Sequence, residues 1–124
     1  MKKIIIKSIP HNKQRYPTCG DYWEKKGTYY IVSSEMDNWK YELLVAFHEL
    51  IEYMLTEDRG IKEQDITDFD VAFMNKHPDG DPGMDKSAPY HKEHIFALKL
   101  EMLFAKQLGV DIKKYEKSME KLFK

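Results

Sequence analysis

One short stretch of the sequence has the residue types and spacing to hold a metal ion and activate a water molecule. His48, Glu49 and Glu52 form an H-E-x-x-E pattern within Trp39–Glu57, whose apolar residues predict a buried helix. On a helix, His48 and Glu52 lie one turn apart, close enough to ligate one ion. Glu49, one residue after His48, points about 100° away from His48 around the helix. Its carboxylate could hold a water molecule on that ion, as in zinc hydrolases of the H-E-x-x-H type.

A second predicted helix, over residues 87–108, carries the remaining candidate ligand. Its solvent-exposed face is marked by lysines seven residues apart, Lys92, Lys99 and Lys106. His94 and Glu101 fall on the opposite side of this helix, where the protein core is expected. Two helices that each direct a histidine and a glutamate inward predict one shared metal site, with His48, Glu52 and His94 as ligands.

The ligand set indicates which ion this site would hold. Two imidazoles and one carboxylate, with a coordination position left open, are typical of catalytic zinc and of some non-haem iron sites. Zn²⁺ is favoured because Glu49 places a base beside the water molecule. Glu93 and Glu101 are the candidates for orienting a ligand imidazole through a hydrogen bond. His91 is an alternative to His94 as a ligand.

The same residues allow three interpretations of function. The first is a zinc-dependent hydrolase in which Glu49 is the general base. The second is an interaction protein, with a structural metal that joins two helices. In the third, no metal is bound and the buried histidines and glutamates form a hydrogen-bonded network. The identity of a substrate does not follow from the sequence.

Composition limits the class of protein. A length of 124 residues predicts a single domain over residues 1–124, and 42% hydrophobic with 33% charged residues is typical of soluble proteins. A net charge of −1 gives no bulk attraction to nucleic acid or to an anionic membrane. The single cysteine, Cys19, excludes an internal disulfide and favours the reducing cytoplasm. No segment has the apolar length needed to cross a bilayer.

The order of the predicted elements indicates an α+β fold that is mainly helical. A strand over residues 3–9 and a hairpin of 21–24 with 28–32 predict a small N-terminal antiparallel sheet. Four helices are expected at about 34–57, 62–75, 87–108 and 111–123. Ser34 and Asp37 have the spacing of a capping box, and Ser87-Ala88-Pro89 would open the third helix. The Pro- and Asp-rich stretch 77–86 is expected to be an ordered loop and not an ion site.

Residues that carry a family resemblance lie roughly between positions 39 and 115. They are the H-E-x-x-E helix, Pro82-Gly83, Ala88-Pro89-Tyr90, Glu93-His94, and Leu108-Gly109-Val110-Asp111. Over these positions the chain resembles a family of small uncharacterised phage and prophage proteins. The resemblance implies a phage-encoded cytoplasmic protein with a paired H-E-x-x-E and E-H site. For the interaction-protein interpretation, it implies a host protein as the partner.

A looser resemblance is to minimal zincin metallopeptidases, in which a small sheet precedes the active-site helix. His48 and Glu49 match the zincin motif, whereas Glu52 stands where those enzymes have their second histidine. This resemblance implies a zincin-like active-site helix.

Overall fold

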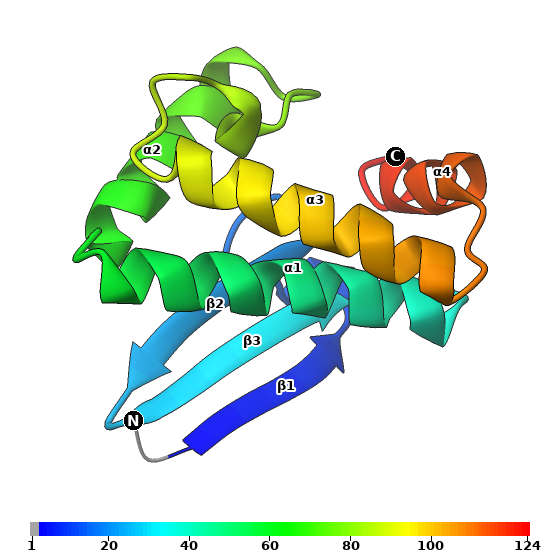
Figure 1. The fold of residues 1–124 in the computed structure, drawn as a ribbon. Coiled ribbons are helices and arrows are strands. Elements are labelled where there is room, and N and C mark those ends of the chain that lie inside the picture. Colours follow the sequence, from blue (N-terminus) through cyan, green and yellow to red (C-terminus); the bar gives the residue numbers. More distant parts are fainter. Residues whose placement is uncertain (1–2) are drawn as a thin grey trace.

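The N-terminal part of the chain forms a three-stranded sheet on which the helices are built (Figure 1). The computed structural model describes residues 3–124. The strands are β1 (Lys3–Ile9), β2 (Gly20–Lys25) and β3 (Thr28–Ser34). β3 is the central strand, and its Ile31 and Val32 side chains are fully buried. The two-residue turn Lys26-Gly27 joins β2 to β3, and both residues have a positive φ, as expected for a tight hairpin.

The sheet is mixed, whereas the sequence predicted an antiparallel one. β2 pairs with β3 in the antiparallel sense, as predicted, but β1 pairs with β3 in the parallel sense. The chain leaves β1, makes a short 3₁₀ turn at His11–Lys13 and enters β2 on the far side of β3. The apolar β3 therefore takes the centre of the sheet. No local turn signal fixed the direction of β1, because each of its residues pairs with one about 25 positions later in the chain, as in Lys3 with Thr28.

The first helix, α1, spans Trp39–Asp58 and begins later than predicted. Its N-cap is Asn38, whose side chain accepts a hydrogen bond from the Lys40 backbone N–H. The predicted capping box was wrong, because Ser34 is the last residue of β3. The helix ends at Asp58 with Arg59 as its C-cap, and Gly60 follows with φ +69°, the left-handed conformation expected after a helix C-terminus.

The remaining helices are α2 (Glu63–Lys76), α3 (His91–Gln107) and α4 (Ile112–Lys121). α3 begins later than expected, because residues 87–90 form a turn that Asp85 holds by accepting hydrogen bonds from the Ser87 N–H and hydroxyl. Asp111 is the N-cap of α4, and its side chain accepts a hydrogen bond from the Lys114 N–H. Residues 77–86 form an ordered loop with a 3₁₀ turn at Pro82–Met84.

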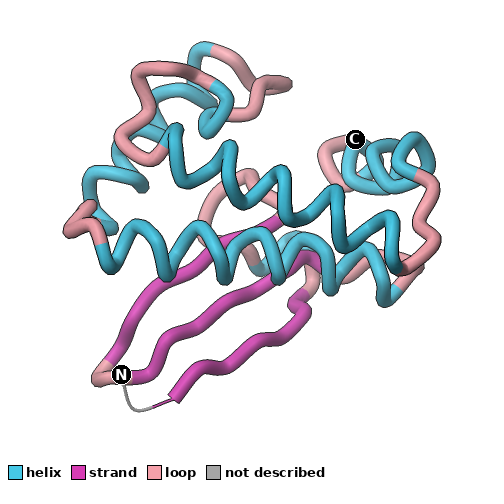
Figure 2. Tube along the Cα trace, viewed as in Figure 1, coloured by secondary structure: helices cyan, strands magenta, loops and turns pink. Residues whose placement is uncertain are grey.

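The elements are arranged in layers, as Figures 1 and 2 show. α1 lies across one face of the sheet, and α3 packs along α1 on the side away from the strands. The α+β class, mainly helical, is therefore confirmed. Among residues 3–124, no helix has both the length and the apolar character to cross a membrane.

Candidate metal centre

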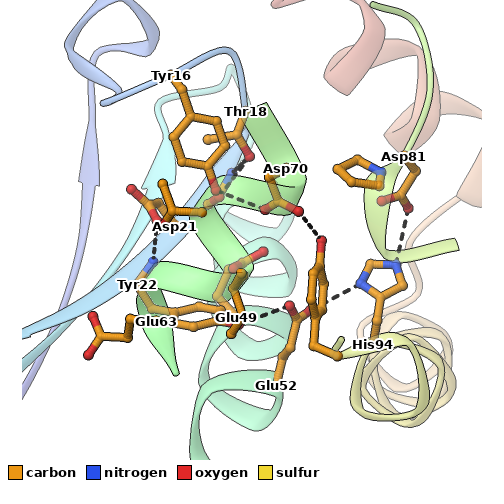
Figure 3. A pocket seen from close by; sticks show the side chains of 15 residues that line it. Tyr16, Thr18, Asp21, Tyr22, Glu49, Glu52, Glu63, Asp70, Asp81 and His94 are labelled. Carbon is orange, nitrogen blue, oxygen red and sulfur yellow. Dashed lines mark hydrogen bonds and ion pairs between the residues drawn. The ribbon is translucent and has the colours of Figure 1, made fainter. Parts of the chain in front are cut away.

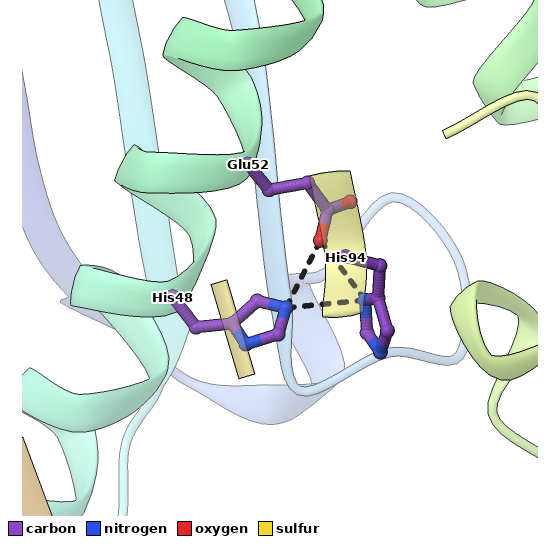
Figure 4. Close-up of side chains that lie close together, drawn as sticks. All are labelled: His48, Glu52 and His94. Atoms are coloured by element: carbon purple, nitrogen blue, oxygen red, sulfur yellow. Dashed lines mark hydrogen bonds and ion pairs between the residues drawn. The ribbon is translucent and has the colours of Figure 1, made fainter. Parts of the chain in front are cut away.

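Three buried side chains meet between α1 and α3. Figure 3 shows Glu52 bonded to His94 at the wall of a cavity, and Figure 4 adds His48. His48 Nε2 and His94 Nδ1 each lie 3.0 Å from Glu52 Oε2, and the two nitrogens lie 3.1 Å apart. Only 4–7% of each residue is exposed. The predicted convergence of these three residues is thus confirmed, and we call the three atoms the inner triangle.

The dimensions of the inner triangle suit a small divalent ion. Zinc is usually bound at about 2.0–2.1 Å from nitrogen and 2.0–2.2 Å from carboxylate oxygen. An ion about 2.05 Å from each corner of a triangle with sides of 3.0–3.1 Å would subtend ligand angles of about 95°. This value lies between octahedral (about 90°) and tetrahedral (about 109°) coordination. The three groups would occupy one side of the ion and leave the other side open.

Each histidine also contacts a carboxylate with its second ring nitrogen. His48 Nδ1 lies 2.7 Å from Glu101 Oε1, and His94 Nε2 lies 3.1 Å from Asp81 Oδ2. Both of these nitrogens must carry hydrogen to donate to a carboxylate. A neutral imidazole has only one N–H. In the neutral rings, therefore, both inner nitrogens present lone pairs toward Glu52 Oε2.

Two tyrosines hold the carboxylates of this site in place. The Tyr22 hydroxyl, from β2, donates to Glu52 Oε1 at 3.1 Å. The Tyr115 hydroxyl, from α4, donates to Glu101 Oε2 at 2.7 Å. Glu52 thus turns one oxygen toward the inner triangle and has the other one bonded. Glu101 likewise has one oxygen bonded to His48 and the other to Tyr115. Both carboxylates therefore have fixed orientations.

Without an ion, the site is a network of opposite charges. Burial lowers the pKa of His48, but hydrogen bonds with Glu101 and Glu52 outweigh it and raise the pKa to about 11. Burial likewise lowers the pKa of His94, and the bonds with Asp81 and Glu52 raise it to about 9. For Glu52, burial raises the pKa, and the two histidines lower it to below its usual value. The inner triangle therefore requires positive charge, supplied either by protons or by a metal ion.

Glu49 stands apart from the inner triangle and faces the adjoining space. It lines both cavities that meet at the site, one beside Glu52 and one beside His48, and His94 lines both as well. Within residues 3–124, no hydrogen bond or ion pair reaches its carboxylate, and it is not part of the three-residue cluster. Burial, and then the charge of Glu52, raise the pKa of Glu49 well above its usual value.

Two glycines fit closely against these side chains. A β-carbon at Gly83 would lie 2.4 Å from His94 Cγ and Nδ1, and one at Gly20 would lie 2.7 Å from Glu49 Cγ. Side chains larger than hydrogen are therefore excluded unless His94 or Glu49 moves. Gly83 was named only for the family resemblance and Gly20 not at all, because the close fit of each arises from contacts between distant segments.

The expected supporting residues are partly correct. Glu101 contacts a histidine of the site, as predicted. Glu93 does not, because Arg59 bonds its carboxylate at 2.6 Å. His91 is directed elsewhere, and its Nδ1 lies 2.9 Å from the Gly83 carbonyl oxygen. Asp81 was missed, since it lies in the loop that was expected to carry no part of an ion site.

No protein family, curated protein or solved structure was found to match this chain. The resemblances to phage proteins and to zincins thus remain predictions. The inference of function rests on the geometry of the site itself.

Proposed function

We propose that the protein is a zinc-dependent hydrolase, with His48, Glu52 and His94 as ligands and Glu49 as general base. The observation that carries this proposal is the pairing of both outer histidine nitrogens with carboxylates. Such pairs are the usual second partners of metal-ligating histidines, where they fix the tautomer and raise the basicity of the ligand. Here they leave a lone pair on each inner nitrogen, and both of these nitrogens lie beside Glu52 Oε2.

The chemistry expected of the site is attack by water on a carbonyl group. A zinc ion supplies a Lewis acid that acidifies a water molecule and polarises the carbonyl. Glu49 accepts the proton as the water oxygen bonds to the carbonyl carbon, and then delivers it to the leaving group as the old bond breaks. One acid and one protonated leaving group result, so atoms and charge balance.

The position of Glu49 suits this role. A base must be free to accept a proton, and no lysine or arginine pairs with the Glu49 carboxylate within residues 3–124. The pKa of Glu49 is raised in the protein without a bound metal ion. A divalent ion beside it adds positive charge, which lowers that pKa toward the range where a carboxylate is ionised at neutral pH.

Metal content is the first test of the proposal. Protein purified without a histidine tag should contain about one zinc per chain by elemental analysis, or take up one on titration. The His48→Ala variant should take up none. A folded wild-type protein that binds no divalent metal would support the charge network of protonated histidines instead.

The second test separates an enzyme from a structural metal site. Glu49→Gln keeps the size of the side chain but removes its ability to take a proton. Zinc content should stay unchanged, while hydrolysis of 4-nitrophenyl esters and anilides by the zinc-loaded protein should be abolished. Loss of zinc in this variant would show that Glu49 is a ligand. Unchanged turnover would show that it is not the base.

A further inference from the structure

The cavity beside the inner triangle has one apolar wall. A space of about 280 Å³ adjoins His48, Glu49 and His94. Its apolar residues come from the helices, the loop before β2 and the turn after α4, and are Pro17, Val45, Met74, Leu98, Met119 and Phe123. This volume lies just below the range of about 300–1,000 Å³ for small-molecule pockets. The cavity can therefore accept one apolar group and no large ligand.

Part of the cavity wall is acidic. Glu49, Asp70 and Asp81 line both this space and the adjoining cavity of about 80 Å³ beside Glu52. Asp70 accepts hydrogen bonds from the hydroxyls of Tyr16 and Tyr90, which hold it at this wall. Among the described residues that line the two cavities there is no lysine and no arginine. An anionic group in either space would meet these carboxylates, and the two lining side chains that could carry positive charge, His48 and His94, would be neutral as zinc ligands.

We infer that the site takes a neutral ester or amide whose acyl part carries one apolar group, and that it rejects carboxylated acyl groups. The inference rests on the proposed function, because the metal ion must hold the reacting carbonyl. The apolar wall then receives the acyl substituent, and the acidic wall disfavours negative charge. Specificity is thus assigned to the space between α1, α2, α3 and α4, next to the inner triangle.

The inference can be tested with ligands that share one metal-binding group. Acetohydroxamic acid, 3-phenylpropionohydroxamic acid and succinic monohydroxamic acid differ only in what they place in the cavity. Calorimetric titration of the zinc-loaded protein should show the phenyl compound binding at least about tenfold more tightly than acetohydroxamic acid. The carboxylated compound should bind more weakly than acetohydroxamic acid.

The possible outcomes separate this inference from the proposed function. If acetohydroxamic acid binds only when zinc is present, but the phenyl compound gains nothing, the substrate preference is wrong and the metal site stands. Tighter binding of the carboxylated compound would also overturn the preference. If zinc is not taken up and no hydroxamate binds, both the function and the preference are wrong.

A pair of variants on α2 locates the apolar subsite. Met74→Asp places a charge in the apolar wall, and should weaken the phenyl compound about tenfold while leaving acetohydroxamic acid unchanged. Val71→Asp is the matched control, because Val71 is 41% exposed and lines neither cavity. Equal effects of the two variants would overturn the placement of the subsite. If Met74→Asp does not fold by circular dichroism, the three-ligand series on the wild type still decides the preference.

Discussion

The two histidines of the site are held in different ways. His48 is bonded to Glu101, whose side chain is 8% exposed, lies on α3 and is fixed by Tyr115. His94 is bonded to Asp81, whose side chain is 56% exposed and lies in a loop. We call His48 with Glu101 the helix-held half of the site, because both residues lie on packed helices. We call His94 with Asp81 the loop-held half, because Asp81 lies in a loop in contact with water.

This difference shows where the site is rigid. In the helix-held half, buried hydrogen bonds fix the orientation of the His48 ring, and water does not compete for these bonds. In the loop-held half, water competes for Asp81, and the loop carries few buried contacts that would hold it in place. We expect mutations in the helix-held half to cost more metal affinity than equivalent mutations in the loop-held half.

Removing either ligand should have the largest effect. Loss of groups that only support a ligand lowers metal affinity by about 10- to 100-fold, so His48→Ala or His94→Ala should exceed about 100-fold. Competition with a chromophoric chelator measures this. Tight zinc binding by His94→Ala would contradict the comparison of the two halves, because His94 would then not be a ligand of the site.

The supporting carboxylates should differ from each other. Glu101→Gln should weaken zinc binding by about 10- to 100-fold, because it removes a buried charged partner of His48. Asp81→Asn should cost less than about tenfold, because water can replace an exposed carboxylate. The same competition measurement applies to both. Equal losses would show that exposure does not distinguish the two halves.

A smaller effect is expected from the glycine that packs on His94. Gly83→Ala should weaken zinc binding by several-fold, since its β-carbon would collide with the imidazole ring and the loop must shift. Gly80→Ala is the matched control in the same loop, because its β-carbon would collide with Phe73 instead. Both variants should show similar circular dichroism spectra. If Gly80→Ala weakens zinc binding as much, the loss reflects general disturbance of the loop.

The last expected effect, measured as stability and not as zinc affinity, is on the pH dependence of unfolding. The folded-state pKa values of about 9 for His94 and about 11 for His48 lie above the ordinary value near 6.5. In chelator-treated protein, this stabilisation is full below about pH 6.5 and is lost as the pH rises through 9 and then 11. Each histidine then loses roughly 1.4 kcal/mol of stabilisation per pH unit, so the melting temperature should fall by more than about 10 °C between about pH 6.5 and 9.

Zinc-loaded protein should not show this fall. Its histidines are neutral ligands and bind no extra proton in this range, while zinc affinity rises with pH because ligands no longer need to lose protons. Scanning calorimetry at several pH values compares the two forms. Parallel curves with and without zinc would indicate that the histidines do not change protonation when metal is added.

The inner triangle could be predicted from the sequence because it follows from helix geometry. The i, i+4 spacing of His48 and Glu52 and the inward position of His94 are fixed once two helices are assumed. Only the packing of α3 against α1 was needed to bring them together. The role of Glu101 followed for the same reason, as it lies on the same side of α3 as His94.

The remaining parts depend on contacts that leave no periodic pattern. Asp81 reaches His94 from a loop, and loop residues have no regular spacing that marks the direction of a side chain. Glu93 was expected at the site, but Arg59, at the end of α1, pairs with it. The parallel pairing of β1 likewise depends on how the intervening residues cross the sheet.

The distance between the ligands along the chain also sets the order of folding events. His48 and Glu52 lie on adjacent turns of one helix, but His94 is 46 residues after His48. Closing that loop costs conformational entropy, which long-range packing of α3 on α1 must offset. Until α3 docks, α1 alone offers two ligands and a weak hold on any ion. A metal ion therefore strengthens an arrangement that the chain must first reach by packing.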